Sequence, residues 1–245
     1  MKNCNAPYSA LGGTFEYLND DCGYEEWSQY LIDKLRGLGV LDGAQGLDIG
    51  CGNGYFTRAL YAAGYDMKGM DISPEMLTKA VELSRAKGLK IDYISGDIVK
   101  LKLNYKPDFI VAVNDCVNYI EKTALKRAFK AVYGNLKKGG AFIFDISSER
   151  KLKHIIGDNL FGEDRGDISY LWFNSLKDDR VEMDITVFTR RSDGLYERAE
   201  ESQTQYIHGE TEILSLLKEV GFEAVSEGDR GLSKENRINF ICRKL

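Results

Sequence analysis

The fold is decided by the stretch Leu47-Asp48-Ile49-Gly50-Cys51-Gly52-Asn53-Gly54. An apolar start precedes it and a helix-like run, residues 55–63, follows it, so the stretch is expected to join a short buried strand to a helix. Glycines at alternate positions let the backbone turn sharply and bring N–H groups close to a ligand, because no Cβ obstructs the approach. The stretch therefore predicts a cofactor-binding loop.

The glycine spacing separates the candidate cofactors. A dinucleotide fingerprint reads G-x-G-x-x-G, whereas here the third glycine comes one residue earlier and Asp48 precedes the first. The pattern apolar-Asp-apolar-Gly-x-Gly-x-Gly resembles motif I of the class I S-adenosylmethionine (SAM) methyltransferases. This resemblance implies that Gly50, Gly52 and Gly54 admit the cofactor and that Asp48 orients the loop and the methionine ammonium of SAM.

Two further acids follow predicted strands. Residues 67–71 end in Asp71, 23 positions after Asp48, which is the rough interval for a carboxylate that binds both ribose hydroxyls. Residues 91–95 precede Asp97, which the resemblance implies faces the adenine amine. Because ligands of open α/β sheets bind beyond the carboxyl ends of the strands, these residues are expected at one site.

The neighbours of these groups complete the expected cofactor site: Cys51, Asn53, Ile72, Met76, Gly96, Ile98 and Asn114. Ser73-Pro74 predicts the start of the helix that carries Met76, with serine as N-cap and proline as first helical residue. Met76 lies on the apolar stripe of that helix, so plain core packing is the alternative to contact with adenine.

The segment Asn114-Asp115-Cys116-Val117-Asn118-Tyr119-Ile120 follows the apolar run 108–113, which is typical of a central parallel strand. It lacks the Pro-Pro and Pro-Cys elements of methyltransferases that act on nucleic-acid bases. Its form, Asp-x-x-Asn-Tyr-apolar, instead resembles small-molecule N- and O-methyltransferases, including those of amino sugars and glycine. Asp115 or Tyr119 is therefore a candidate to accept the proton of the substrate, and Cys116 is expected to be a packed thiol.

The N-terminal arm supplies one more candidate. Small-molecule methyltransferases often carry a tyrosine and then Tyr-Asp in such an arm, where it covers the methionine end of the cofactor. Phe15-Glu16 stands in place of Tyr-Asp here, which leaves Tyr8 as the catalytic candidate of the arm. Core packing of Tyr8, Phe15, Tyr17 and Trp27 is the alternative.

Residues 162–205 break the alternation of strands and helices. The runs 168–173, 180–190 and 195–207 alternate polar and apolar residues, and turn sequences separate them, so an antiparallel β insertion is expected. Its position resembles that of a lid over the active site, and a dimerisation sheet is the alternative. The predicted fold is α/β: a Rossmann-like, seven-stranded methyltransferase sheet with an inserted antiparallel β lid. The predicted units are an arm and SAM-binding core at 1–147, a lid at 148–208 and a completion of the core at 209–245.

Composition limits the partners. The chain has 245 residues, with 38 acidic against 33 basic side chains, a formal net charge of −5 and a pI of about 5.3. Such a surface repels a phosphate backbone, so nucleic acid is not an expected partner. The sequence shows neither a membrane span nor a signal-peptide core, and a cytoplasmic enzyme is expected. Five cysteines without CxxC spacing and two histidines indicate reduced thiols and no metal site.

The sequence thus predicts a SAM-dependent methyltransferase that acts on a nitrogen or oxygen of a small molecule, as a monomer or homodimer. Two alternatives stay open at this point. An NAD(P)-dependent Rossmann oxidoreductase shares the glycines and Asp71, but would need the last glycine one residue later and gives Asp97 no role. A non-catalytic SAM-binding protein would bind the cofactor without transferring its methyl group.

Overall fold

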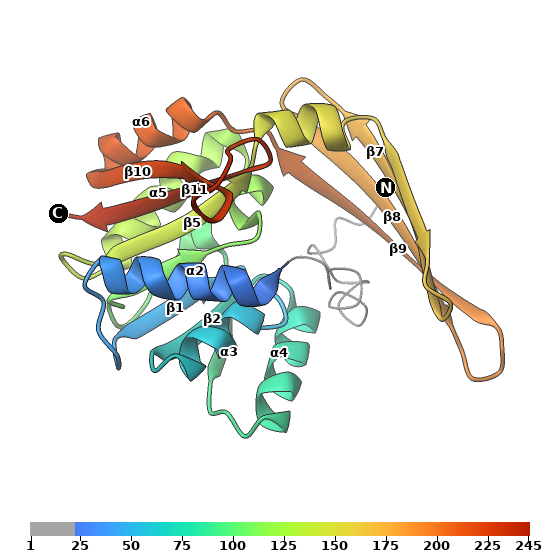
Figure 1. Cartoon of the computed structure of the whole chain (residues 1–245), viewed down its shortest axis with the longest axis horizontal. Coiled ribbons are helices and arrows are strands. Elements are labelled where there is room, and N and C mark those ends of the chain that lie inside the picture. The colour runs from blue at the N-terminus through green and yellow to red at the C-terminus, as the bar shows by residue number, and fades with distance from the viewer. Residues whose placement is uncertain (1–22) are drawn as a thin grey trace.

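The computed structural model describes residues 23–245. Tyr8 and the rest of the predicted arm lie outside them. Within the described residues, seven strands form a central sheet in the order β10-β11-β5-β4-β1-β2-β3, and four more form a second sheet in the order β6-β7-β8-β9 (Figure 1). The fold class predicted from the sequence, a seven-stranded α/β sheet with a separate antiparallel sheet, is confirmed.

The element bounds are as follows. The helices are α2 (Tyr24–Gly37), α3 (Tyr55–Ala62), α4 (Pro74–Ala86), α5 (Lys122–Asn135) and α6 (Glu210–Val220). The central strands are β1 (Gln45–Ile49), β2 (Asp66–Asp71), β3 (Asp92–Ser95), β4 (Phe109–Ala112), β5 (Ala141–Ser147), β10 (Phe222–Gly228) and β11 (Arg237–Lys244). The strands of the second sheet are β6 (Leu160–Asp164), β7 (Ile168–Leu176), β8 (Arg180–Arg190) and β9 (Tyr196–Tyr206). Short helical turns are η1 (Ile98–Lys100), η2 (Cys116–Tyr119), η3 (Lys151–Ile156) and η4 (Asp229–Gly231).

Each face of the central sheet has its own hydrophobic core. Successive side chains of a strand point to opposite faces, so Phe109 and Val111 of β4 pack with α2 and α3, while Ile110 and Ala112 pack with α5 and α6. Burial on both faces explains why β4 and β5 are continuously apolar runs.

Strand order fixes the place of the site. Strands β1, β2, β3 and β4 are parallel, with β2 on one side of β1 and β4 on the other. The segments that leave β2 and β4 therefore diverge on either side of β1, and a crevice forms at the carboxyl ends, where ligands of such sheets bind.

The second sheet is antiparallel throughout and extends away from the core in Figure 1. It starts one strand earlier than the sequence predicted, because β6 is short and pairs with β7. We call it the lid sheet, after the role expected for it. One of its faces carries Val181 and Met183, which pack with Leu152 and Ile156 of η3. The lid sheet is therefore anchored to the core next to the end of β5.

Candidate functional site

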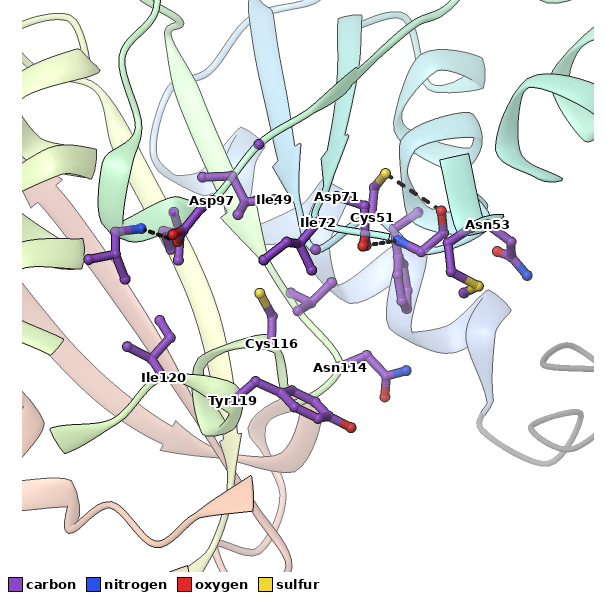
Figure 2. A pocket seen from close by; sticks show the side chains of 18 of the residues that line it. Ile49, Cys51, Asn53, Asp71, Ile72, Asp97, Asn114, Cys116, Tyr119 and Ile120 are labelled. Carbon is purple, nitrogen blue, oxygen red and sulfur yellow. Dashed lines mark hydrogen bonds between the residues drawn. The ribbon is translucent and has the colours of Figure 1, made fainter. Parts of the chain in front are cut away.

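A cavity of about 370 Å³ lies at the carboxyl ends of β1, β2, β3 and β4. Most of the residues predicted for the site line it: Gly50, Cys51, Gly52, Asn53, Asp71, Ile72, Met76, Gly96, Asp97, Ile98, Asn114 and Tyr119. Figure 2 shows the labelled side chains of this set around one space. Three predicted residues, Asp48, Gly54 and Asp115, lie outside the lining.

The glycine loop makes the sharp turn that its sequence predicts, but three of its N–H groups are hydrogen-bonded to acceptors within the protein. Gly50, Gly52 and Gly54 have φ angles of 68°, 54° and 80°, a region that favours glycine. The N–H groups of Cys51, Gly52 and Gly54 donate to Met70 O, Asp71 Oδ2 and Cys51 O, at 3.0, 2.8 and 2.8 Å. The sequence predicted bare N–H groups for a ligand, and for these three amides that is wrong, because β2 accepts the first two through Met70 O and the Asp71 carboxylate and the loop itself accepts the third.

Packing explains two of the glycines. A Cβ on Gly50 would lie 2.5 Å from Cys116 Sγ, and one on Gly54 would clash with the hydroxyl of Tyr93. Gly54 is thus needed for the contact between its loop and Tyr93 of β3, although it does not line the cavity. Gly50 brings the loop close to Cys116 on the other side of the site.

Asp48 lies beneath the loop rather than on the cavity wall. It is 1% exposed, and its Oδ2 accepts a 2.6 Å hydrogen bond from Thr57 Oγ1 of α3. Burial raises the pKa of Asp48 to about 7, against the stabilising hydrogen bond from Thr57. The carboxyl group therefore joins β1 to α3, which fits the predicted orientation of the loop, and it does not line the cavity.

Asp71 is held at the cavity by two backbone donors. Gly52 N–H donates to Oδ2 at 2.8 Å (Figure 2). Ser73 N–H donates to Oδ1 at 2.9 Å. Burial raises the pKa of Asp71, and these N–H groups oppose the shift because they stabilise the charged form. The carboxylate is thus fixed in orientation and keeps acceptor capacity for a ligand in the cavity.

Asp97 and its neighbours form another part of the wall. Asp97 caps η1, with Val99 N–H donating to Oδ1 at 2.8 Å. Ile72 is 52% exposed although apolar, whereas Met76 and Ile98 are buried. An exposed isoleucine beside a carboxylate offers a flat heterocycle an apolar surface next to a hydrogen-bond acceptor.

The end of β4 is strained and braced from β5. Asn114 and Asp115 have φ angles of 62° and 66°, which non-glycine residues adopt at a cost. Asp145 of β5 accepts the N–H groups of both, at 2.6 and 3.1 Å. This brace turns the chain out of the sheet and places Asn114 on the cavity wall.

Asp115 points away from the cavity into a buried ion cluster. Its carboxylate accepts hydrogen bonds from Arg237 at 2.9 Å and from Ser147 Oγ at 2.8 Å, and Arg237 also pairs with Asp145. Burial alone would raise the pKa of Asp115, but Arg237 and Lys151 hold it below its usual value. A carboxylate so engaged is a poor proton acceptor, so the geometry gives no support to the catalytic role predicted for it.

Tyr119 joins the cavity to the lid sheet. Its hydroxyl donates to Gln203 Oε1 at 2.9 Å and accepts from Gln205 Nε2 at 3.2 Å, both on β9. The adjacent Asn118 donates to Tyr206 O at 3.0 Å and accepts from Ser147 N at 2.9 Å. The Asn-Tyr pair singled out in the sequence therefore ties β9 to the core beside the site.

Two thiols line the cavity. Burial raises the pKa of Cys51 and of Cys116 above the usual value, which disfavours the reactive thiolate. Among residues 23–245, Cys51, Cys116 and Cys242 are free. In the same part of the chain, no group of three or more His, Cys, Asp or Glu side chains could hold a metal ion, and no helix is long and apolar enough to cross a membrane.

The lining residues that were not predicted for the site are Tyr24, Ile49, Tyr55, Phe56, Val99, Val113, Cys116, Ile120, Glu121 and Ala124. Tyr55 and Phe56 follow the last glycine of the loop directly, and that adjacency was an available signal. Tyr24 packs against Tyr55 with the rings tilted by 30° and their centroids 4.5 Å apart. No local sequence pattern indicated Tyr24, because it lies at the start of α2, before the glycine loop and the strands that form the cavity.

The donor set fits SAM. Asp71 and Asp97 are the carboxylates expected for ribose and for adenine, apolar side chains lie beside them, and the aromatic residues Tyr24 and Tyr55 line the same cavity. Aromatic faces suit a positively charged sulfonium.

Comparisons with known proteins also indicate a methyltransferase. Residues 47–140 match a family described as methyltransferase domain. A SAM-dependent methyltransferase of Clostridium acetobutylicum ATCC 824, whose structure is solved, is 32% identical, with 94% of this chain and 96% of that chain covered and a TM-score of 0.87. A protein of Geobacillus sp. (strain WCH70) that bears a methyltransferase name is 28% identical over 97% of this chain and 99% of its own length.

A third relative shows the same fold with the cofactor bound. The SAM-bound CalS10, an amino pentose methyltransferase of Micromonospora echinaspora, has a TM-score of 0.75 at 17% identity, with 95% of this chain and 97% of that chain covered. The chain therefore belongs to the SAM-dependent methyltransferases of class I fold, and S-adenosylmethionine is its cofactor.

Proposed function

We propose that this protein transfers the methyl group of SAM to an amino or hydroxyl group of a small polar molecule. The observation that carries the proposal is the polar wall from the end of β4, where Asn114 and Tyr119 line the cavity and Tyr119 is hydrogen-bonded to the lid sheet. An amino group is favoured over a hydroxyl, since the similarly folded KedS8 of Streptoalloteichus sp ATCC 53650 is a sugar N-methyltransferase. The family membership excludes the oxidoreductase alternative.

Each side chain has a proposed task. Asp71 binds the ribose and Asp97 the adenine of SAM, while Ile72, Met76 and Ile98 pack against the heterocycle. Asn114 contacts the methionine portion. When bound, SAM supplies a methyl group on a positive sulfur, which a lone pair of the acceptor attacks as the carbon–sulfur bond breaks.

The protein then has to align the acceptor and exclude water. Tyr119 is proposed as the group that contacts the acceptor and receives its hydrogen bond, in preference to Asp115, whose carboxylate is bound to Arg237. Residues 148–208 are proposed as a lid unit between the core segments 1–147 and 209–245.

The test is methyl transfer by the purified full-length chain. The protein is incubated with methyl-labelled SAM and, separately, amino sugars, glycine, aliphatic amino alcohols and catechols, and products are assigned to nitrogen or oxygen by NMR. A labelled amine among the products is the expected result. Binding of SAM in calorimetry without transfer to any compound would instead favour the non-catalytic SAM-binding protein.

A further inference from the structure

Asp145 is the one acidic residue of β5, a strand whose residues are all buried. A buried carboxylate is costly unless it is paired and hydrogen-bonded. Arg237 supplies the opposite charge, and the N–H groups of Asn114 and Asp115 supply hydrogen bonds. An apolar residue at this position would fill the core but would leave these two backbone donors without their acceptor.

The carboxylate of Asp145 acts where the ladder between β4 and β5 ends. Ala112 and Phe144 are the last pair of that ladder. Asn114 N–H then donates to Oδ1 of Asp145 at 2.6 Å, and Asp115 N–H donates to Oδ2 at 3.1 Å. Successive N–H groups of a regular strand point to opposite sides, so one side chain accepts both only where the chain leaves the strand.

Both donors belong to residues with left-handed backbone. The φ angles of Asn114 and Asp115 are 62° and 66°, and residues with a Cβ keep such angles only where their surroundings determine them. The two hydrogen bonds to a single rigid carboxylate fix the orientation of both peptide units. Asp145 is therefore a local cause of the turn that follows β4.

This turn decides how the chain runs along the cavity. Asn114 lines the cavity, and Cys116, Tyr119 and Ile120 line it further along the chain (Figure 2). Cys116 comes so close to the glycine loop that a Cβ on Gly50 would lie 2.5 Å from its Sγ. A different course after β4 would therefore move one wall of the cavity relative to the loop.

We propose that Asp145 is a positioning residue of the cofactor site, which holds the turn after β4, and with it the wall of residues 114–120, in the conformation that binds SAM. Asp145 does not line the cavity, so it acts through Asn114 and not by contact with the cofactor. The inference rests on the proposed function for the contact of Asn114 with the methionine portion. The affinity for S-adenosylhomocysteine, the product form of the cofactor, measures it without any methyl transfer.

The experiment compares two carboxylates of the same ion cluster. Asp145→Asn places an NH₂ group where one of the two backbone N–H groups needs an acceptor. Asp115→Asn is the matched control, because it also removes a counter-charge of Arg237 but keeps both backbone hydrogen bonds to Asp145. Asp145→Glu is a second test, since it keeps the charge and moves the carboxylate by one methylene. Affinity is measured by calorimetry, and thermal unfolding checks that each variant is folded at the temperature of the titration.

Backbone chemical shifts add a reading that a loss of stability alone would not change. The ¹³C shifts of Asn114 in the free protein report its left-handed conformation. They should move towards the values of ordinary backbone in Asp145→Asn and in Asp145→Glu. In Asp115→Asn they should stay as in the wild type.

Both Asp145 variants are expected to bind S-adenosylhomocysteine at least tenfold more weakly than the wild type, and Asp115→Asn less than threefold more weakly. An equal loss in Asp145→Asn and Asp115→Asn would assign the effect to the missing charge and overturn the proposal. Wild-type affinity in either Asp145 variant, or unchanged shifts of Asn114 in both, would overturn it as well. Failure of the proposed function is a separate result: the affinities change as expected, and no methyl group is transferred to any acceptor.

Discussion

Replacing Arg237 by methionine should destabilise the protein strongly. The guanidinium is the counter-charge for Asp115 and Asp145, whose side chains are 14% and 0% exposed, and it also lies 4.3 Å from the ring of Trp27. Removing one member of a buried ion pair costs about 3–5 kcal/mol, because the remaining charge stays buried without compensation. The loss of the stacking contact adds about 0.5–2 kcal/mol.

The pH dependence of the stability loss in Arg237→Met tests this explanation more specifically than the loss at a single pH. Without Arg237, Asp145 loses its opposite charge and Asp115 keeps only Lys151, 3.8 Å away. The pKa of Asp145, which burial already raises to about 6, and the lowered pKa of Asp115 should therefore both rise. A folded state that binds protons more tightly gains stability as the pH falls. The deficit of the variant should therefore be largest near pH 7.5 and shrink towards pH 5.

The assay is urea unfolding of wild type, Arg237→Met and Arg237→Lys at both pH values. Arg237→Lys should keep part of the stability, because an ammonium retains the charge but not the forked geometry. Arg198→Met is the control, since the exposed pair of Arg198 with Glu200 should contribute no more than about 1 kcal/mol. A loss below about 1 kcal/mol in Arg237→Met, or an equal loss at both pH values, would refute the reasoning.

Three further predictions concern the cofactor loop and the strand ends. The pKa of Asp48, raised to about 7, makes the wild-type folded state lose stability as the pH rises from about 4 to 7. Asp48→Asn removes this loss, so its stability at pH 8 relative to pH 5 should exceed that of wild type by about 2.6 kcal/mol, measured by thermal unfolding at the two pH values. Gly50→Ala should lower the free energy of unfolding in urea by about 2 kcal/mol, since φ is 68° and the new Cβ would lie 2.5 Å from Cys116 Sγ. Adding Cys116→Ala should recover the steric part of this loss, and fully additive losses of stability in the double variant would contradict the contact. Asp71→Asn should weaken SAM binding about tenfold in calorimetry, because a charged acceptor for the ribose is lost. Asp66→Asn, at the other end of β2, should leave SAM binding unchanged, and an equal loss of affinity in both variants would contradict a role of Asp71 in binding the cofactor.

The sequence alone determined the fold and most of the lining of the candidate site. A glycine loop after an apolar strand, with acids at the ends of the next two strands, leaves little freedom, because parallel strands bring their carboxyl ends to one edge of the sheet. Asp71 and Asp97 were found in this way, and both line the cavity. The alternation of apolar residues likewise placed the lid strands β7, β8 and β9 with nearly correct bounds.

The tertiary structure alone decided the direction in which each polar side chain points. Asp115 follows β4 as the sequence predicted, yet its left-handed backbone turns the carboxylate towards Arg237 of β11, 122 residues further on. The link from Tyr119 to Gln203 and Gln205 spans 84 and 86 residues. Such long-range pairs leave no local pattern, because periodicity records which face of an element is buried and not which distant side chain meets it.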